Sequence, residues 1–429
     1  MSIGRRAGAA SACGLWTVLW GLSWGAGAWA GGVETSAGLG AEMSAGLGGY
    51  AMTRDGSGTS WQPDDSEHDG IHWAAGNWLL MSDALLDAVD DHQDGARGAD
   101  KDFVSGMAML MATRVLESGD IVRLRTMVSP EPLMGADGYP LLLATGETAN
   151  GVTPLIDRQH PHNLIDELSG SIAHPLAAGQ SIYLYAGLPG EPAFGPPVFM
   201  HRESSMDDPA APITHHWLDS THVTNGVVTV GYVHEDWKIE LSRFYGREPD
   251  QYRYRIEPGP LDSSAARLSW NPLATLSLQA SWAHQVSPEQ LAPSQNETRA
   301  TVSAMYTVAF PGGGAWASTA AYGYRRSTGR PGLPAELLES AIKPNGAWTF
   351  FGRFERVDND ELIDVENFEA PAYTVAELSI GVIHDWRLIE HVKLGLGGLY
   401  AFNFVPAALI DQYGHDPAGI MVFLRLKVD

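Results

Sequence analysis

The sequence predicts an all-β fold: a transmembrane antiparallel β-barrel of sixteen strands, with fourteen strands as the alternative count. From about residue 73 onward, apolar and polar residues alternate with a period of two, as in barrel strands that face lipid on one side. Short turns alternate with long connections, the arrangement of bacterial outer-membrane barrels. After the first thirty residues, no segment has the roughly eighteen consecutive apolar residues of a membrane-spanning helix.

The alternation is clearest in residues 275–284, where one face carries only apolar side chains and the other carries Thr, Ser and Gln. The apolar face consists of Leu276, Leu278, Ala280 and Trp282. The last segment, 420–427, repeats the pattern. Six tryptophans are expected near strand ends, as in the aromatic girdles of membrane barrels: Trp237, Trp270, Trp282, Trp316, Trp348 and Trp386.

Connections of two lengths set the strand count. Short turns are predicted at 117–119, 177–180, 234–236, 271–272, 311–314, 343–346 and 386–388. Long connections are predicted at 130–163, 188–220, 246–263, 285–296, 357–371 and 403–416. Outer-membrane barrels place short turns in the periplasm and long loops outside, so both termini are expected in the periplasm. That arrangement requires an even number of strands. The number is even when residues 335–342 are counted as a strand.

Three regions follow along the chain. Residues 1–30 read as a signal peptide, with Arg5 and Arg6 before an apolar stretch and Ala28-Trp29-Ala30 at the cleavage site. This segment contains the single cysteine, Cys13, so no disulfide is expected in the mature protein. Residues 31–70 are rich in Gly and Ser and are expected to form a flexible periplasmic lead-in, or alternatively a plug of the lumen. Residues 71–429 are the predicted barrel.

The charge balance limits the partners. The formal net charge is −24, which excludes a general nucleic-acid binder and favours cations. The expected partners are outer-membrane lipid, the outer-membrane barrel assembly machinery, and small solutes or metal cations. The chain ends in Lys427-Val428-Asp429 rather than in the aromatic residue that this machinery recognises in many barrels.

Histidine is concentrated in the two longest predicted loops. Seven of the fifteen histidines lie between residues 160 and 222, with two methionines among them. Imidazole and thioether groups together suit copper or zinc better than magnesium or calcium. The candidate metal ligands are His160, His162, Met200, His201, Met206, His215, His216 and His222. The alternative is that these histidines bond to backbone groups and brace two packed loops.

Charged residues in the same loops and on inward strand positions could form a constriction with a transverse field. The candidate constriction residues are Asp157, Arg158, Asp207, Asp208, Asp219, Arg247, Arg353 and Glu355. The alternative is that the arginines pair with loop carboxylates and have a structural role.

The sequence does not predict a catalytic triad. Ser220 lies between Asp219 and His222, but neighbours along an extended strand point to opposite faces, and no nucleophile elbow is present. We therefore expect no catalytic residues and no enzyme activity, with an outer-membrane hydrolase as the remote alternative.

The run from Gly138 to Asp262 resembles a family of uncharacterised outer-membrane proteins of Gram-negative bacteria. The motifs that carry this resemblance are Gly138-Tyr139-Pro140-Leu141-Leu142, Thr145-Gly146-Glu147-Thr148, Asp157-Arg158-Gln159-His160-Pro161-His162, Pro189-Gly190-Glu191-Pro192-Ala193, Phe199-Met200-His201-Arg202, His215-His216-Trp217, Asp219-Ser220-Thr221-His222 and Gly246-Arg247-Glu248-Pro249-Asp250. Members of this family tend to be encoded near copper and heavy-metal resistance functions. The resemblance therefore implies an outer-membrane location and a connection with metals, but no activity.

Two functions follow from these observations. The leading hypothesis is a porin-like channel for small solutes or cations, with the histidine-rich loops at its mouth or constriction. The second is a metal-binding surface protein whose barrel is plugged and acts as an anchor.

Overall fold

The computed structural model describes residues 46–67, 70–363 and 371–429. The predicted signal peptide and residues 31–45 lie outside these ranges, so neither expectation is tested.

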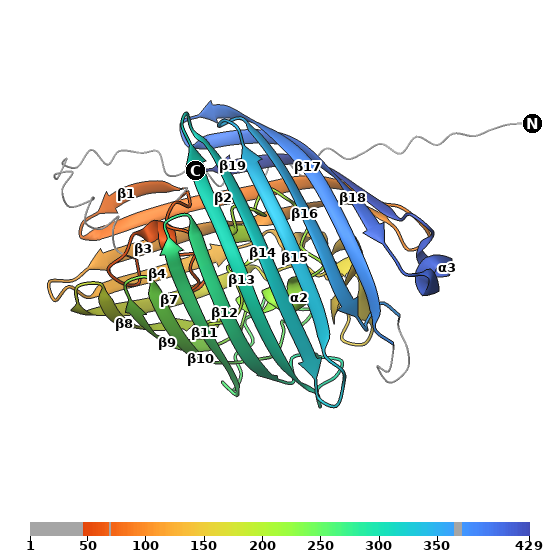
Figure 1. Ribbon diagram of the computed structural model, residues 1–429, viewed down its shortest axis with the longest axis horizontal. Coiled ribbons are helices and arrows are strands. Elements are labelled where there is room, and N and C mark those ends of the chain that lie inside the picture. The colour runs from red at the N-terminus through yellow and green to blue at the C-terminus, as the bar shows by residue number, and fades with distance from the viewer. Residues whose placement is uncertain (1–45, 68–69, 364–370) are drawn as a thin grey trace, which may run out of the picture. The chain divides into compact units, whose positions relative to one another are not determined.

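Within the described residues, sixteen strands form one closed antiparallel barrel (Figure 1). They are β2 (Trp78–Gln93), β3 (Asp100–Val115), β4 (Ile121–Val128), β7 (Ile165–Ala177), β8 (Gln180–Gly187), β9 (Val227–His234), β10 (Trp237–Phe244), β11 (Ser263–Leu273), β12 (Leu276–Val286), β13 (Asn296–Phe310), β14 (Gly314–Ser327), β15 (Leu333–Lys343), β16 (Trp348–Asn359), β17 (Tyr373–Ile389), β18 (Val392–Phe404) and β19 (Ala418–Val428). Each pairs with the next, and β19 closes the ring by pairing with β2 from Gly419–Gln93 to Val428–Ala84. The short strand β1 (Ile71–Ala75) forms a hairpin with the start of β2.

The predicted all-β fold and the count of sixteen are thus confirmed, and the physical reason is the alternation of the strands. In β12 and β19, apolar side chains such as Trp282 and Leu424 face outward, while their neighbours are buried in the lumen. Closure satisfies the backbone hydrogen-bonding groups of every strand edge, which a bilayer requires. No helix among the described residues is long and apolar enough to cross a membrane.

The tryptophan belt lies at the end of the barrel that carries the short turns. Trp237 and Trp270, on adjacent strands, stack with ring centroids 4.7 Å apart. Trp316, Trp348 and Trp386 are exposed near the same end of their strands, whereas Trp282 lies near mid-strand.

Two turns are displaced from their predicted positions. The turn expected at 271–272 lies at 274–275, because β11 continues past an irregularity between Trp270 and Leu273. The turn expected at 386–388 lies at 390–391, because β17 runs to Ile389. Neither shift changes the strand count.

Residues 46–67 occupy the lumen at the short-turn end. Arg54 donates to the backbone oxygen of Glu235, Asn271 donates to that of Gln62 at 2.8 Å, and the Asp65 amide donates to the oxygen of Ala274. We call residues 46–67 the plug, and the division of the chain at residues 31–70 stays a prediction, because residues 31–45 lie outside the described ranges. Polar strand residues bind the backbone of this Gly- and Ser-rich segment, so it needs few apolar side chains of its own.

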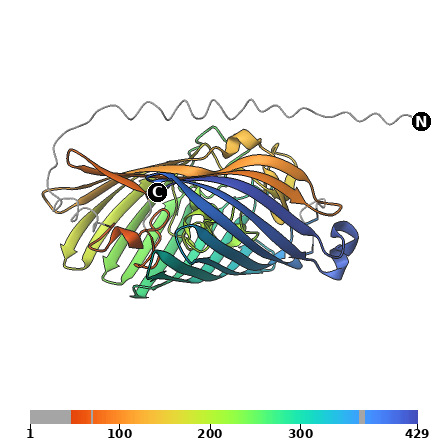
Figure 2. The same ribbon diagram turned by 90° about the horizontal axis from the view of Figure 1, so that it is seen from above.

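The two longest loops also fold into the lumen. Residues 129–164 contain the hairpin β5 (Tyr139–Thr148) and β6 (Pro154–Gln159), and every residue of β5 is buried. Residues 188–226 contain the short helix α2 (His215–Leu218), which contacts β13 and β14 from inside. Figures 1 and 2 show these segments enclosed by the wall of strands. The lumen is therefore filled by three segments of the chain itself.

Candidate metal centre

Five of the predicted histidine ligands meet inside the lumen. His160 and His162 come from the segment after β6, His215 and His216 from α2, and His222 from the turn that follows α2. Ring centroids of neighbouring members are 5.0 Å apart for His162–His222, 5.3 Å for His215–His222 and 5.4 Å for His215–His216. The two longest loops are thus joined by a buried group of imidazoles, which we call the histidine cluster.

Three members of this cluster form a triangle. The centroid distances are 5.4 Å for His160–His216, 5.4 Å for His215–His216 and 5.9 Å for His160–His215. Imidazoles that share one tetrahedral zinc ion, with Zn–N distances of 2.0–2.1 Å, have ring centroids roughly 5 Å apart. The triangle therefore has nearly the spacing of a three-histidine metal site without an ion in place.

The Nδ1 atoms of the triangle face carboxylates. His215 Nδ1 lies 2.7 Å from Asp219 Oδ1, and His216 Nδ1 lies 3.2 Å from Glu248 Oε1. His160 Nδ1 lies farther away, 3.5 Å from Glu147 Oε1. A carboxylate on one ring nitrogen orients a metal-binding histidine and makes its other nitrogen a better ligand.

The Nε2 atoms of the same three histidines are buried and have no hydrogen-bond partner among the described residues. Buried polar atoms are nearly always paired, so three unpartnered imidazole nitrogens in one group need an explanation. Gly146 leaves room at one of them, because a Cβ at this position would lie 2.4 Å from His216 Nε2. A bound cation would satisfy all three.

Two of the three imidazoles are in the neutral form at neutral pH, whereas for His216 the effect of burial is outweighed by the Glu248 charge, which raises its pKa. Burial lowers the pKa of His160 well below its usual value, and the nearby Arg253 guanidinium lowers it further. Burial also lowers the pKa of His215, against the opposing effect of Asp219. Both imidazoles are then neutral, the form that binds metals.

His162 and His222 form a separate pair beside the triangle. Burial alone would lower the pKa of His162, but the Glu131 carboxylate, 2.8 Å from Nδ1, raises it to about 9. His162 is then protonated and donates from Nε2 to His222 Nε2 at 2.9 Å. His222 holds the backbone oxygen of Asp219 through Nδ1. This pair is a hydrogen-bonded brace between the two loops, which the sequence analysis kept as the alternative reading of the histidines.

Two acidic residues beside the triangle, Glu248 and Glu289, were not candidates in the sequence analysis. Ligand atoms of His216, Glu248 and Glu289 all lie within 4.8 Å of one another. Glu289 is half-buried, and desolvation followed by the neighbouring Glu248 charge raises its pKa well above the usual value. A cavity of about 70 Å³ next to them is lined by five carboxylates, from Glu147, Glu289, Glu297, Asp360 and Glu361. Because these carboxylates are far apart in the sequence, no local motif predicts that they lie together.

Five candidate constriction residues are buried where the 188–226 loop meets the barrel wall, and they fasten the loop. Asp219 accepts from Arg202 at 2.6 Å, and Arg202 also donates to Glu339 on β15 at 2.6 Å. The other contacts are Asp207 with Arg425 and Lys343, Asp208 with Arg353 at 3.4 Å, and Glu355 with Thr214 at 2.8 Å through its amide and 2.6 Å through its hydroxyl.

The other three candidates lie apart from this contact. Asp157 is buried and pairs with Arg97 at 2.6 Å, next to the β5–β6 hairpin. Arg158, the next residue, is partly exposed and pairs with Asp137 at 2.6 Å. Arg247 lies over the Tyr245 ring, outside the lumen-filling loops.

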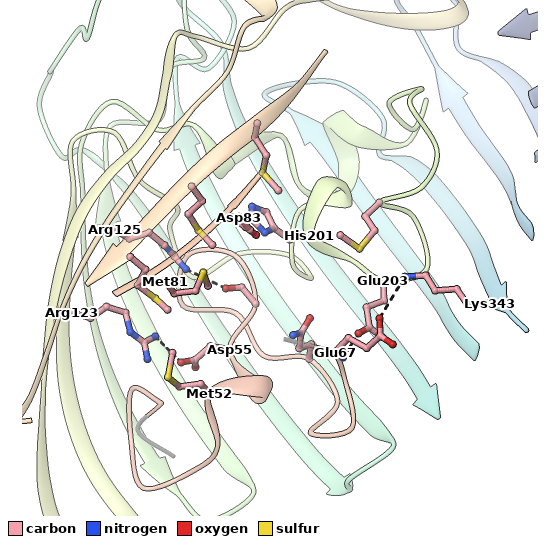
Figure 3. A pocket seen from close by; sticks show the side chains of 16 residues that line it. Met52, Asp55, Glu67, Met81, Asp83, Arg123, Arg125, His201, Glu203 and Lys343 are labelled. Carbon is pink, nitrogen blue, oxygen red and sulfur yellow. Dashed lines mark hydrogen bonds and ion pairs between the residues drawn. The ribbon is translucent and has the colours of Figure 1, made fainter. Parts of the chain in front are cut away.

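Three candidate metal ligands lie away from the triangle. His201 Nε2 is 3.4 Å from the sulfur of Met127, and His201 and Met206 line a cavity of about 90 Å³ at the plug (Figure 3). Met200 packs between this cavity and the histidine cluster. Burial, followed by the Arg125 charge, lowers the pKa of His201 to about 4.

Ser220 is not arranged as a nucleophile. Its hydroxyl accepts a hydrogen bond from Arg299 at 2.7 Å, its one side-chain partner among the described residues. Asp219 holds His215 and Arg202 instead. The geometry is not that of a Ser-His-Asp triad.

No family model and no curated protein matches the sequence. Solved structures with a similar fold include an anion-selective porin from Comamonas acidovorans, with a TM-score of 0.48, 11% identity, and coverage of 82% of this chain and 99% of that one. OprB of Pseudomonas putida gives a TM-score of 0.48, 9% identity and coverage of 82% and 94%. OmpF of Salmonella typhi in complex with daunomycin gives 0.49, 9%, and coverage of 83% and 100%. These similarities concern the fold and say nothing about a transported solute or copper resistance, so the link to metals stays a prediction.

Proposed function

We propose that this outer-membrane barrel admits a divalent transition-metal cation, Zn(II) or Cu(II), into its lumen and binds it at His160, His215 and His216. The observation that carries the proposal is the buried triangle of imidazoles, whose three Nε2 atoms lack a partner among the described residues and whose Nδ1 atoms face carboxylates. Three protein nitrogens with a fourth position open suit these borderline metals.

The surroundings support a cation as the ligand. Glu248 and Glu289 lie beside His216, and the acidic cavity of about 70 Å³ lies on the side of the long loops. Carboxylates in a confined, water-poor space attract and concentrate cations. In this proposal the long loops face the outside of the cell and the short turns face the periplasm, so the ion arrives through the acidic cavity.

Titration of the folded full-length protein with Zn(II) and Cu(II) tests the proposal. We expect stoichiometric binding in the wild type and its loss in the His215→Gln and His160→Gln variants. His174→Gln is the matched control, because His174 is exposed and pairs with Asp120 far from the triangle. Equal binding by wild type and His215→Gln would contradict the proposal.

A passive channel for small solutes is the second candidate. The closed ring of sixteen strands favours it, because barrels of this size enclose an aqueous pore when their lumen is not filled. Planar-bilayer conductance separates the two candidates. A passive channel requires a steady conductance, with preference for cations from the acidic balance, whereas the filled lumen predicts a conductance near the baseline.

A further inference from the structure

Methionine is concentrated on one side of the lumen, next to the plug. Eight of the thirteen methionines of the chain lie there, and those in the barrel wall are almost fully buried. They are Met52, Met81, Met107, Met109, Met111, Met127, Met200 and Met206. We call this group the methionine cluster.

The wall half of the cluster is a flat array on three adjacent strands. Met107, Met109 and Met111 alternate along β3, so all three face the lumen. In the strand register, Met111 lies opposite Met81 of β2, and Met109 lies opposite Met127 of β4. Directly opposed residues have Cβ atoms about 5 Å apart, within reach of one shared ion for side chains as long as methionine.

Segments inside the lumen supply the other half. Met52 of the plug and Met206 of the 188–226 loop line the same cavity of about 90 Å³ as Met81 and the β3 row. His201 reaches it from the same loop, with Nε2 3.4 Å from the sulfur of Met127. Figure 3 shows Met52, Met81 and His201 around this space.

We propose that the methionine cluster is a second metal site, which binds a soft monovalent cation, Cu(I) or Ag(I), through thioether sulfurs and the His201 imidazole. Thioethers are soft, neutral ligands that favour Cu(I) over magnesium or calcium. The proposal does not depend on the histidine triangle, which has nitrogen ligands, a different cavity and a preference for divalent ions.

The charges around the cavity suit a single positive charge. Four carboxylates line it, from Asp55, Glu67, Asp83 and Glu203, against three cationic side chains, from Arg123, Arg125 and Lys343. Asp55 is paired with Arg123 at 2.7 Å, and Lys343 lies 3.8 Å from Glu67 (Figure 3). The lining thus has no excess of positive charge, and Arg125 and Lys343 are also paired with Glu167 and Asp207, which lie outside it.

Methionine is also a common filler of irregular apolar space, and that role explains many buried methionines. Here six of the eight methionines line a cavity whose walls also carry charged side chains. A filler can be replaced by leucine without loss of any ligand, because the two side chains have similar volumes. Leucine substitution therefore separates a filler from a ligand.

The test uses the folded full-length protein and Ag(I), a redox-stable probe, followed by Cu(I) in competition with a chromogenic chelator. The variant carries Met107→Leu, Met109→Leu and Met111→Leu together. We expect one tightly bound Ag(I) in the wild type and an affinity lower by more than about 100-fold in the variant, the upper range for loss of a supporting group alone. X-ray absorption of the wild-type complex should show sulfur neighbours around the metal.

The matched control is Met305→Leu with Met421→Leu, two buried methionines on β13 and β19 outside the cluster. This control should bind Ag(I) as the wild type does. The circular dichroism spectrum and the melting temperature of both variants should match those of the wild type, which reports that the barrel is folded. Undiminished Ag(I) affinity in the triple variant, or absorption spectra with nitrogen and oxygen neighbours alone, would overturn the proposal.

Discussion

Arg202 is the side chain whose removal should release the 188–226 loop from the barrel wall. It is fully buried and bridges two carboxylates, Asp219 of the loop and Glu339 of β15. Its Nη1, which binds Asp219, also donates to the backbone oxygen of Pro197 at 2.8 Å. The perturbation is Arg202→Ala, which removes all of these bonds and leaves two carboxylates buried close together.

Breaking a buried ion pair by removing one partner costs about 3–5 kcal/mol, because the remaining charge is left uncompensated. The barrel strands keep their own hydrogen bonds, so we expect most of this cost to favour states in which the loop has left the wall. The population of such open states should then rise roughly 150- to 5,000-fold.

Two measurements report the release. In planar bilayers, Arg202→Ala should show frequent openings that the wild type shows rarely, and limited proteolysis should cut the variant within 188–226. Arg158→Ala is the matched control, because the Arg158–Asp137 pair is partly exposed and such pairs contribute at most about 1 kcal/mol. Wild-type conductance and wild-type protease resistance in Arg202→Ala would refute the reasoning.

Three further predictions concern other parts of the lumen. The raised pKa of His162, about 9 beside Glu131, stabilises the fold below pH 6.5 and ceases to do so as pH rises through 9. The wild-type melting temperature should therefore fall over this range, by the equivalent of about 3 kcal/mol, and Glu131→Gln should remove most of that slope. Deleting residues 46–67 should raise bilayer conductance, since this segment fills the short-turn end; unchanged conductance would show that the loops alone close the lumen. Gly146→Ala should weaken Zn(II) binding at least about 10-fold in calorimetry, because its Cβ would lie 2.4 Å from His216 Nε2; wild-type affinity would place the ion elsewhere.

The barrel was predictable because each strand carries its own signal. In segments such as 275–284, apolar and polar residues alternate because one face meets lipid. This pattern can be recognised in a single strand without knowing its neighbours in the sheet. The even count also fixed 335–342 as a strand, and β15 occupies this position. Turn positions were predicted less well near Pro272, because an irregularity extends β11 past the residue that suggested a break.

The contents of the lumen were harder to predict, because they depend on contacts between distant residues. The plug has a composition that usually indicates a flexible linker, and its order comes from strand side chains such as Arg125 and Lys238, which bind its backbone oxygens. The sequence identified His160, His215 and His216 as candidates, but not that these three meet while His162 pairs with His222.

The methionine cluster had a local signal that was not used. Met107, Met109 and Met111 have the spacing of one strand face, which by itself predicts three thioethers in a row. The pairing of β3 with β2 and β4 brings Met81 and Met127 beside them. This pairing is known from the structure and not from the sequence.

The most direct test of the central claim is the zinc K-edge X-ray absorption spectrum of the folded protein loaded with one equivalent of Zn(II). A site at His160, His215 and His216 predicts three imidazole nitrogens at about 2.0–2.1 Å and a fourth, lighter ligand. The same spectrum should lose its imidazole signature in the His215→Gln variant. A wild-type spectrum with oxygen neighbours alone, or a protein that retains no zinc, would contradict the account.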